Sequence, residues 1–245
     1  MKRERLKQFI VAASLLLAFA LGIELQANGF IDDFLYYWED ITYLAVEHVK
    51  LTLISGGLAI LLAVPIGIVL SRPACRRFSE AFMQIFNIGS TVPTLAVLAL
   101  SMTFLGVGNT PAIFALVIAT ILPIVRNTYT GLIAVPAHLK EAAIGMGLTP
   151  MQLLWKVELP NALYVIIAGI RTAFAINIGT VPLAFLIGGT GLGELIFTGI
   201  DLDELTMMLA GAIPTAALAV LFDIGFGALT FMMVSKGVNP LRQRG

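Results

Sequence analysis

Long stretches without a charged residue alternate with short polar segments along the chain. One of these stretches, Leu51–Ser71, has 21 residues, which is enough to cross a hydrocarbon core of about 30 Å at about 1.5 Å per residue. Another, residues 81–125, is too long for one helix, and the turn-forming segment Gly106–Pro111 divides it in two. The pattern predicts an all-α, polytopic bundle of about six transmembrane helices. The apolar runs that define these spans are residues 8–23, 51–71, 81–125 (two spans), 161–193 and 205–235.

The N-terminal run at residues 8–23 has two possible interpretations. It follows the basic stretch at residues 1–7, as in a signal peptide, but residues 24–28 lack a convincing small-x-small cleavage site. We therefore expect a retained helix. The chain then divides into three parts, which are the N-terminal helix with an acidic loop (1–44), a transmembrane domain (45–235) and a basic tail (236–245).

The composition excludes a folded water-soluble domain. Hydrophobic residues make up 58% of the chain, charged residues only 12%, and the mean hydropathy is +0.94, so there are too few charges to cover a soluble surface of this size. The single cysteine, Cys75, excludes an internal disulfide and a cysteine-based metal cluster, and we expect no metal site. Fifteen basic residues balance fifteen acidic ones, so the net charge gives no information about nucleic acid. We expect membrane lipid around the chain and no nucleic acid as a partner.

The positions of the charges predict how the helices are threaded. Thirteen of the fifteen Lys and Arg residues lie before the first span, after the second, between the fourth and fifth, or after the last. Acidic residues dominate two loops on the other side, at residues 24–47 and 194–204. Basic residues that flank short loops collect on the cytoplasmic side. We therefore expect a multi-pass inner-membrane protein with both termini in the cytoplasm.

The longest cytoplasmic segment, residues 126–160, carries a helical pattern of its own. A first short helix is expected at residues 136–146, and Gly147 can adopt the left-handed conformation that ends it. Thr149 and Gln152 form a capping box that starts a second helix, which we expect to end by the Leu-Pro pair that closes the segment. Two short helices joined by a tight turn would form a rigid projection suited to a cleft on another protein. An interfacial hairpin is the alternative.

The same segment contains a spaced motif. Glu141-Ala142-Ala143 is followed after three residues by Gly147, and after nine more by Val157-Glu158-Leu159-Pro160. This spacing resembles the EAA loop of importer-type ABC transporter permeases. Four further segments sharpen the resemblance to the glycine betaine, carnitine and choline (osmoprotectant) branch of that binding-protein-dependent permease family, and they lie at residues 90–95, 122–131, 168–173 and 187–193. The resemblance covers about residues 45–235.

The resemblance implies a type I ABC importer permease fold with a defined set of partners. The EAA hairpin would insert into cytoplasmic ATPase subunits that carry ATP and Mg²⁺, and a second permease, identical or paralogous, would complete the pathway. A substrate-binding protein would dock on the acidic outer face. The chain would have no cofactor of its own and would not be an enzyme, because it lacks the G-x-x-x-x-G-K-S/T phosphate loop. The residues that the resemblance assigns to ATPase coupling are Glu141, Ala142, Ala143, Gly147, Leu159 and Pro160.

Two charged residues lie inside the expected spans. Arg171 and Asp223 each fall about 15 Å from the cytoplasmic ends of their helices, at about 1.5 Å per residue, so they can share one depth. Because an unpaired charge at that depth is costly, we expect them either to pair or each to face a polar pathway. A static pair and a gating pair are equally open. Irregular backbone near Asn177, Thr180 and Pro182 makes these three residues candidates for lining the pathway.

Three classes of function follow from these observations. The leading hypothesis is the permease subunit of an ATP-driven importer for glycine betaine, choline or carnitine, with a methionine or other amino-acid permease as the nearest alternative. An ion-coupled secondary transporter could use Arg171 and Asp223 as its coupling pair. An intramembrane enzyme is disfavoured, because the spans contain no metal-ligand cluster or Ser/His arrangement and both His48 and His138 are expected outside them.

Overall fold

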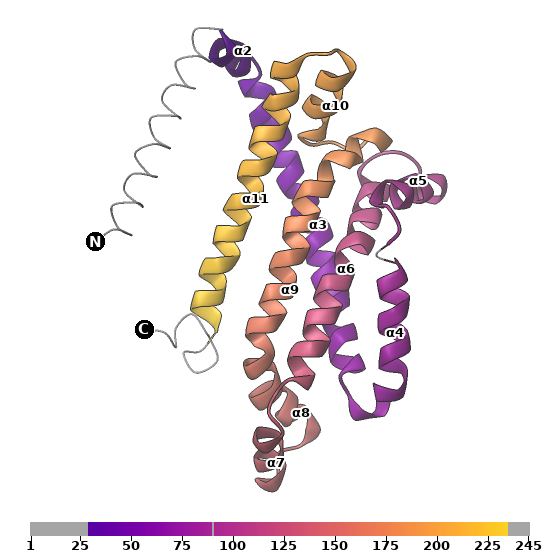
Figure 1. Ribbon diagram of the computed structural model, residues 1–245, viewed down its shortest axis with the longest axis vertical. Coiled ribbons are helices and arrows are strands. Elements are labelled where there is room, and N and C mark those ends of the chain that lie inside the picture. Colours follow the sequence, from indigo (N-terminus) through magenta and orange to yellow (C-terminus); the bar gives the residue numbers. More distant parts are fainter. Residues whose placement is uncertain (1–28, 90, 235–245) are drawn as a thin grey trace, which may run out of the picture.

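The computed structural model describes residues 29–89 and 91–234, and within these ranges the chain is helical with no β-strand. Four long helices, α3, α6, α9 and α11, run side by side and form the body of the molecule (Figure 1). The elements are α2 (Phe30–Tyr36), α3 (Trp38–Leu70), the 3-10 helix η1 (Pro73–Cys75), α4 (Arg76–Gly89), α5 (Thr94–Leu105), α6 (Asn109–Ile133), α7 (Ala137–Gly145), α8 (Pro150–Leu153), the π-helix η2 (Leu154–Glu158), α9 (Leu159–Thr180), the 3-10 helix η3 (Val181–Ile187), α10 (Gly193–Asp201) and α11 (Leu205–Met233).

Four helices in the described ranges are long and apolar enough to cross a membrane. They are α3, α6, α11 and a continuous helix from residue 150 to 187 that joins α8, η2, α9 and η3. A fifth candidate span is the pair α4 and α5, which are bent against each other by 91°. The first expected span, residues 8–23, lies outside the described residues. The prediction of an all-α, polytopic bundle is confirmed.

Helix boundaries follow the sequence prediction at glycines but not at a charge. α5 ends at Leu105 and α6 begins at Asn109, with Gly106 and Gly108 between them at φ of 81° and 113°, so the expected split is confirmed. α6 continues past Arg126 to Ile133, so the first residues of the segment 126–160 extend the helix of the preceding span.

Close packing between α3, α6 and α9 depends on glycine. A Cβ atom on Gly67 of α3 would lie 2.6 Å from the Cβ of Thr128 of α6. A Cβ atom on Gly169 of α9 would lie 2.5 Å from the Cβ of Asn127 of α6. In lipid the hydrophobic effect does not drive helices together, so close contacts of this kind provide much of the association energy. These three helices therefore form one tightly packed unit.

The two ends of the bundle carry different chemistry. The end with α7 and α8, which we call the hairpin end, lies at the bottom of Figure 1, and α2 and α10 lie at the opposite end. At the end with α2 and α10, Tyr37 donates a hydrogen bond of 2.5 Å to Glu204, which joins the start of α3 to the start of α11. This hydrogen bond raises the pKa of Tyr37 to about 12. The end opposite the hairpin also carries exposed acidic side chains, namely Asp32, Asp33, Glu39, Asp40, Asp201 and Asp203.

Candidate coupling site

The turn between α7 and α8 is built from two capping motifs. After α7, Gly147 adopts a φ of +81°, its N–H donates to the Ile144 carbonyl at 2.9 Å, and the N–H of Leu148 donates to the Ala143 carbonyl at 3.1 Å. This is the glycine-dependent arrangement that closes a helix C-terminus. Before α8, the Thr149 hydroxyl accepts from the Gln152 N–H at 3.3 Å, and the Gln152 side chain accepts from the Thr149 N–H at 2.9 Å. The predicted turn and capping box are confirmed.

The second helix of the hairpin does not stop where the sequence suggested. The prediction that it ends by Leu159-Pro160 is wrong, because α8 passes through the π-helical turn η2 directly into α9. Pro160 has no N–H to donate, and its ring would clash with the carbonyl four residues before it in an α-helix. The wider π turn accommodates this residue. The hairpin is therefore one end of a helix that also crosses the membrane.

The motif residues are divided between the surface and the interior of the hairpin. Glu141, Ala142 and Gly147 are exposed, whereas Ala143 is 1% exposed. The Ala143 side chain thus lies inside the hairpin and not on the face expected to dock. Its carbonyl also accepts the hydrogen bond that closes the turn. Leu159 is half-buried and Pro160 is exposed.

Large apolar side chains at the tip of the hairpin were missed by the sequence analysis. Ile144, Met146 and Met151 are 59%, 73% and 64% exposed. We call these three residues the apolar tip. Their position beside a predicted turn in a polar segment was the available signal. Contiguous exposed apolar surface at a projecting turn is typical of a protein contact site, and methionine adapts well to such contacts.

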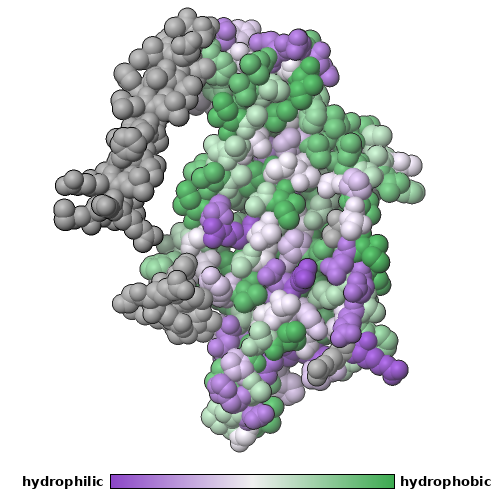
Figure 2. All heavy atoms as spheres, viewed as in Figure 1, coloured by the Kyte–Doolittle hydropathy of each residue, from purple (hydrophilic) through white to green (hydrophobic). Residues whose placement is uncertain are grey.

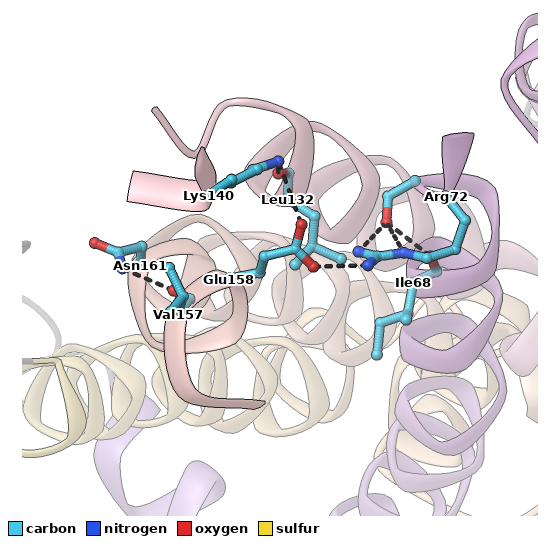
Figure 3. Close-up of polar contacts among 8 residues, drawn as sticks. Ile68, Arg72, Leu132, Lys140, Val157, Glu158 and Asn161 are labelled. Atoms are coloured by element: carbon cyan, nitrogen blue, oxygen red, sulfur yellow. Dashed lines mark hydrogen bonds and ion pairs between the residues drawn. The ribbon is translucent and has the colours of Figure 1, made fainter. Parts of the chain in front are cut away.

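Glu158 forms the centre of a charge network behind the hairpin (Figure 3). One of its carboxylate oxygens lies 2.7 Å from Arg72 Nη1, and the other lies 3.3 Å from Lys140 Nζ. Lys140 also donates to the Leu132 carbonyl at 3.0 Å, and Arg72 Nε donates to the Ile68 carbonyl at 3.2 Å. Glu158 is only 4% exposed. The sequence analysis assigned no role to Glu158, so this network was missed.

This network, which we call the Glu158 clamp, joins four elements. Arg72 follows α3, Leu132 lies at the end of α6, Lys140 lies in α7 and Glu158 closes η2. A buried carboxylate is stable only when its charge is compensated, and here the compensation comes from two different elements. The clamp therefore fixes the hairpin to the ends of two membrane-crossing helices.

Arg171 and Asp223 form a second ion pair in the middle of the bundle. Arg171 Nε and Nη2 donate to the two carboxylate oxygens of Asp223, which connects α9 to α11. Their side chains are 44% and 47% exposed, and Figure 2 shows hydrophilic groups interrupting the apolar surface at mid-height beside α11. Of the two arrangements left open by the sequence, direct pairing is the one observed. The described part of the chain therefore leaves about half of each side chain uncovered.

Asn177 belongs to a buried polar cluster between α3 and α9. Its amide donates to Ser55 Oγ at 2.8 Å and to the Thr52 carbonyl at 3.4 Å. Nearby, His48, which was expected outside the spans, lies within the long helix α3, and its Nε2 is 3.1 Å from the Ile178 carbonyl. Asn177 and His48 are each 0% exposed. The expectation that Asn177 lines an open pathway is therefore wrong in this structure, because its side chain holds two helices together.

The other two pathway candidates lie where α9 loses its α-helical form. The 3-10 helix η3 begins at Val181, so the expected irregular backbone is present. Pro182 is buried, and a Cβ atom on Gly193 would lie 2.0 Å from its carbonyl oxygen, so Pro182 packs against the start of α10 and does not line an open surface. Thr180 is half-buried and bonds to the Ile176 carbonyl of its own helix.

Residues 63–233 match the family described as "Binding-protein-dependent transport system inner membrane component". The chain belongs to this family. The similarity to curated permeases is high. The chain is 55% identical over 184 residues to the osmoprotectant import permease protein OsmY of Salmonella typhimurium, covering 75% of this chain and 78% of that protein. It is 40% identical over 219 residues to the choline transport system permease protein OpuBB of Bacillus subtilis, covering 89% and 96%.

Solved structures identify the fold of this family member. An inward-facing MetNI methionine ABC transporter chain superposes with a TM-score of 0.71 at 23% identity, covering 80% of this chain and 97% of that one. An amino acid ABC transporter chain superposes with a TM-score of 0.63 at 17% identity, covering 86% and 96%. The resemblance to importer-type ABC permeases is confirmed, and the chain is a multi-pass inner-membrane component.

Proposed function

We propose that this chain is the transmembrane permease subunit of an ATP-driven importer for a quaternary ammonium osmoprotectant such as glycine betaine, choline or carnitine. The observation that carries the proposal is the projecting hairpin α7–α8, which is continuous with a membrane-crossing helix and fixed to two others by the Glu158 clamp. A separate ATPase could move these helices through it. The class of solute is supported by the two similar permeases, whose names give osmoprotectant and choline transport.

In this proposal the hairpin docks in a groove of a cytoplasmic ATPase subunit, which carries ATP and Mg²⁺. The apolar tip supplies the contact area, and the exposed Glu141 carboxylate can pair with a basic group at the rim of the groove. Ala142 and Gly147 leave room for close approach. Ala143 acts from inside by closing the turn, and Leu159 and Pro160 act by directing the hairpin into α9. The hairpin end is then the cytoplasmic end.

Two further partners are part of the proposal. A second permease subunit is supported by α11, because only 11% of its most apolar segment is buried, against 33–44% for the other three spans. The half-exposed ion pair of Arg171 with Asp223 supports it as well. A substrate-binding protein is supported by the acidic end of the bundle, where a basic surface would find electrostatic complementarity.

A purified complex tests the proposal directly. The chain is isolated with the ATPase and permease subunits that assemble with it, placed in liposomes, and supplied with receptor protein and radiolabelled glycine betaine. ATP hydrolysis stimulated by the loaded receptor, together with ATP-dependent solute accumulation, is the expected result. An ATPase variant without its phosphate-loop lysine is the control.

A secondary transporter in which Arg171 and Asp223 couple uptake to an ion gradient gives the opposite result. Accumulation by this chain alone, abolished by collapsing the proton or sodium gradient, would overturn the proposal. Stimulation by a methionine-loaded or other amino-acid-loaded receptor in place of the betaine-loaded one would retain the importer and replace the solute.

A further inference from the structure

A polar hollow of about 300 Å³ lies between α4 and α6 in the half of the bundle near the hairpin. Its wall contains one carboxylate, Glu80 of α4, and one guanidinium, Arg126 of α6, together with the ring of Tyr129. Figure 2 shows hydrophilic groups among the apolar ones in the lower half of the molecule. The volume is at the lower end of the range for small-molecule sites.

Arg126 is the unusual residue in this wall. It lies seven residues before α6 ends at Ile133, which places it about 10 Å inside the helix end at about 1.5 Å per residue. Its side chain is exposed, and no ion pair or side-chain hydrogen bond reaches it from residues 29–89 or 91–234. A charge within a membrane-crossing helix normally has a partner or faces an aqueous cavity. Arg126 therefore presents a charge without a partner in the described ranges to the hollow that it lines.

Glu80 has the complementary charge but does not neutralise Arg126. No ion pair joins the two side chains in the described ranges, although both line the same hollow. Two unlike charges that line one cavity without touching leave room for a molecule whose negative group faces Arg126 and whose positive group faces Glu80. Such a molecule is a small zwitterion.

A second cavity lies along the same two helices. A larger apolar cavity of about 570 Å³ is lined by Phe86 and Gly89 of α4 and by Leu122 and Pro123 of α6, with Ile176 of α9 at its side. On α6 these residues precede those of the polar hollow, and on α4 they lie at the end of the helix beside Asn87. A solute moving along the α4–α6 face would thus pass from apolar walls to the charged wall before it reaches the hairpin end.

We propose that Glu80, Arg126 and Tyr129 form a binding station for a zwitterionic quaternary ammonium solute, on the hairpin side of the translocation pathway. The Arg126 guanidinium donates two parallel hydrogen bonds to the solute carboxylate. A quaternary ammonium has no hydrogen to donate, so it is held by the Glu80 charge and by the face of the Tyr129 ring. This inference rests on the proposed function, because it specifies how that class of solute is recognised inside the membrane.

The station makes a prediction that separates three solutes. Glycine betaine and carnitine carry a carboxylate, whereas choline carries the same trimethylammonium group with a neutral hydroxyl. The Arg126→Gln variant should therefore bind the first two more weakly and retain its affinity for choline. The Glu80→Gln variant should weaken binding of all three, because it acts on the group that they share.

Equilibrium binding of radiolabelled solute to the purified transporter complex without receptor measures this directly, with uptake in liposomes alongside. A charge-assisted hydrogen bond contributes about 1.5–3 kcal/mol, so the Kd for glycine betaine should rise roughly tenfold or more in Arg126→Gln. The Kd for choline should stay within about twofold of its original value. Arg77→Gln is the matched control, because Arg77 is an exposed arginine of α4 that does not line the hollow. Subunit assembly and basal ATP hydrolysis report on folding.

Three outcomes would overturn the station. One is an equal loss of betaine and choline in Arg126→Gln, and another is no change in either. The third is a loss that occurs only in vesicles with anionic lipid and is the same for every solute, because Arg126 would then hold a lipid phosphate. If the unmodified complex neither binds nor transports any of the three solutes, the proposed function itself fails, which is a different result from a selective failure of the variants.

Discussion

Glu158 is a buried carboxylate that faces one cation with each of its two oxygens. The Glu158→Gln variant leaves Arg72 and Lys140 without their partner, and breaking a fully buried pair costs about 3–5 kcal/mol. Water screens the two cations, whose side chains are 29% and 26% exposed, so we expect a smaller loss of about 1–3 kcal/mol. The free energy of unfolding in detergent, measured by titration with denaturant, gives this loss. Uptake per ATP hydrolysed should fall as well, because the hairpin is no longer fixed to the bundle.

A matched variant distinguishes the Glu158 clamp from a general effect of charge. Lys156 lies on the same π turn, is exposed and has no ion-pair partner in the described ranges, so Lys156→Gln should leave stability unchanged. Arg72→Gln should cost more than Lys140→Gln, because its bond to Glu158 is 2.7 Å against 3.3 Å. Equal stability of the Glu158 and Lys156 variants would contradict the clamp.

Gly169 allows α9 to contact α6 at a distance that no other residue permits. In Gly169→Ala the new Cβ would lie 2.5 Å from the Cβ of Asn127 and 2.9 Å from the Pro123 carbonyl oxygen. Neither atom is the end of a flexible side chain, so the helices must separate, at a cost of about 1–3 kcal/mol. Gly179→Ala on the same helix is the control, because a Cβ atom there meets nothing within 4 Å. The melting temperature of the purified chain should fall in the first variant and stay unchanged or rise in the second.

At the scale of the element, the hairpin depends on the conformation of one residue. Gly147 has a φ of +81°, and a Cβ atom there would meet nothing within 4 Å. Gly147→Ala therefore tests backbone strain without a steric clash inside this chain. The left-handed conformation costs other residues about 1–2 kcal/mol. We expect the turn to open and ATP-dependent uptake to fall, while the transmembrane helices stay folded by circular dichroism. Gly145→Ala, in the last turn of α7 with equally open surroundings, should have no effect on uptake.

Local signals predicted the elements that local chemistry determines. The turn at Gly147, the capping box at Thr149 and the break between α5 and α6 each depend on residues within one or two turns of one another. The continuation of the second hairpin helix through Pro160 was not predictable in the same way. A proline normally ends a helix, and only the packing around η2 makes a π turn the better solution.

Partners far apart in the sequence account for the parts of the site that were missed or misplaced. Glu158 is 86 residues from Arg72, and Asn177 is 122 residues from Ser55. No spacing rule connects such residues, so the sequence gives no sign that one closes a clamp and the other is buried. The pairing of Arg171 with Asp223 could be anticipated only because charges are rare in membrane spans, which leaves few possible partners.

At the scale of the whole molecule, the weakest covering of the bundle is at α11. Only 11% of its apolar window is buried, and its ion pair to α9 is about half exposed. An exposed ion pair has a small free-energy cost in water but a large one in hydrocarbon. The pair must therefore contact either a second subunit or an aqueous pathway. A pair covered by a subunit stabilises the assembly, whereas a pair on the pathway changes with the transport cycle.

Reversal of the two charges separates these roles. Arg171→Asp and Asp223→Arg each place two like charges together, so each single variant should lose assembly or uptake, and the double variant should recover it because the pair is restored with its ends exchanged. If the pair is static, assembly and uptake fall and recover together. If the pair gates the pathway, the single variants still assemble but hydrolyse ATP without a loaded receptor, and the double variant stops this idle hydrolysis. If the double variant recovers neither property, direct pairing is not the functional state. Arg171 and Asp223 would then each act on a different partner.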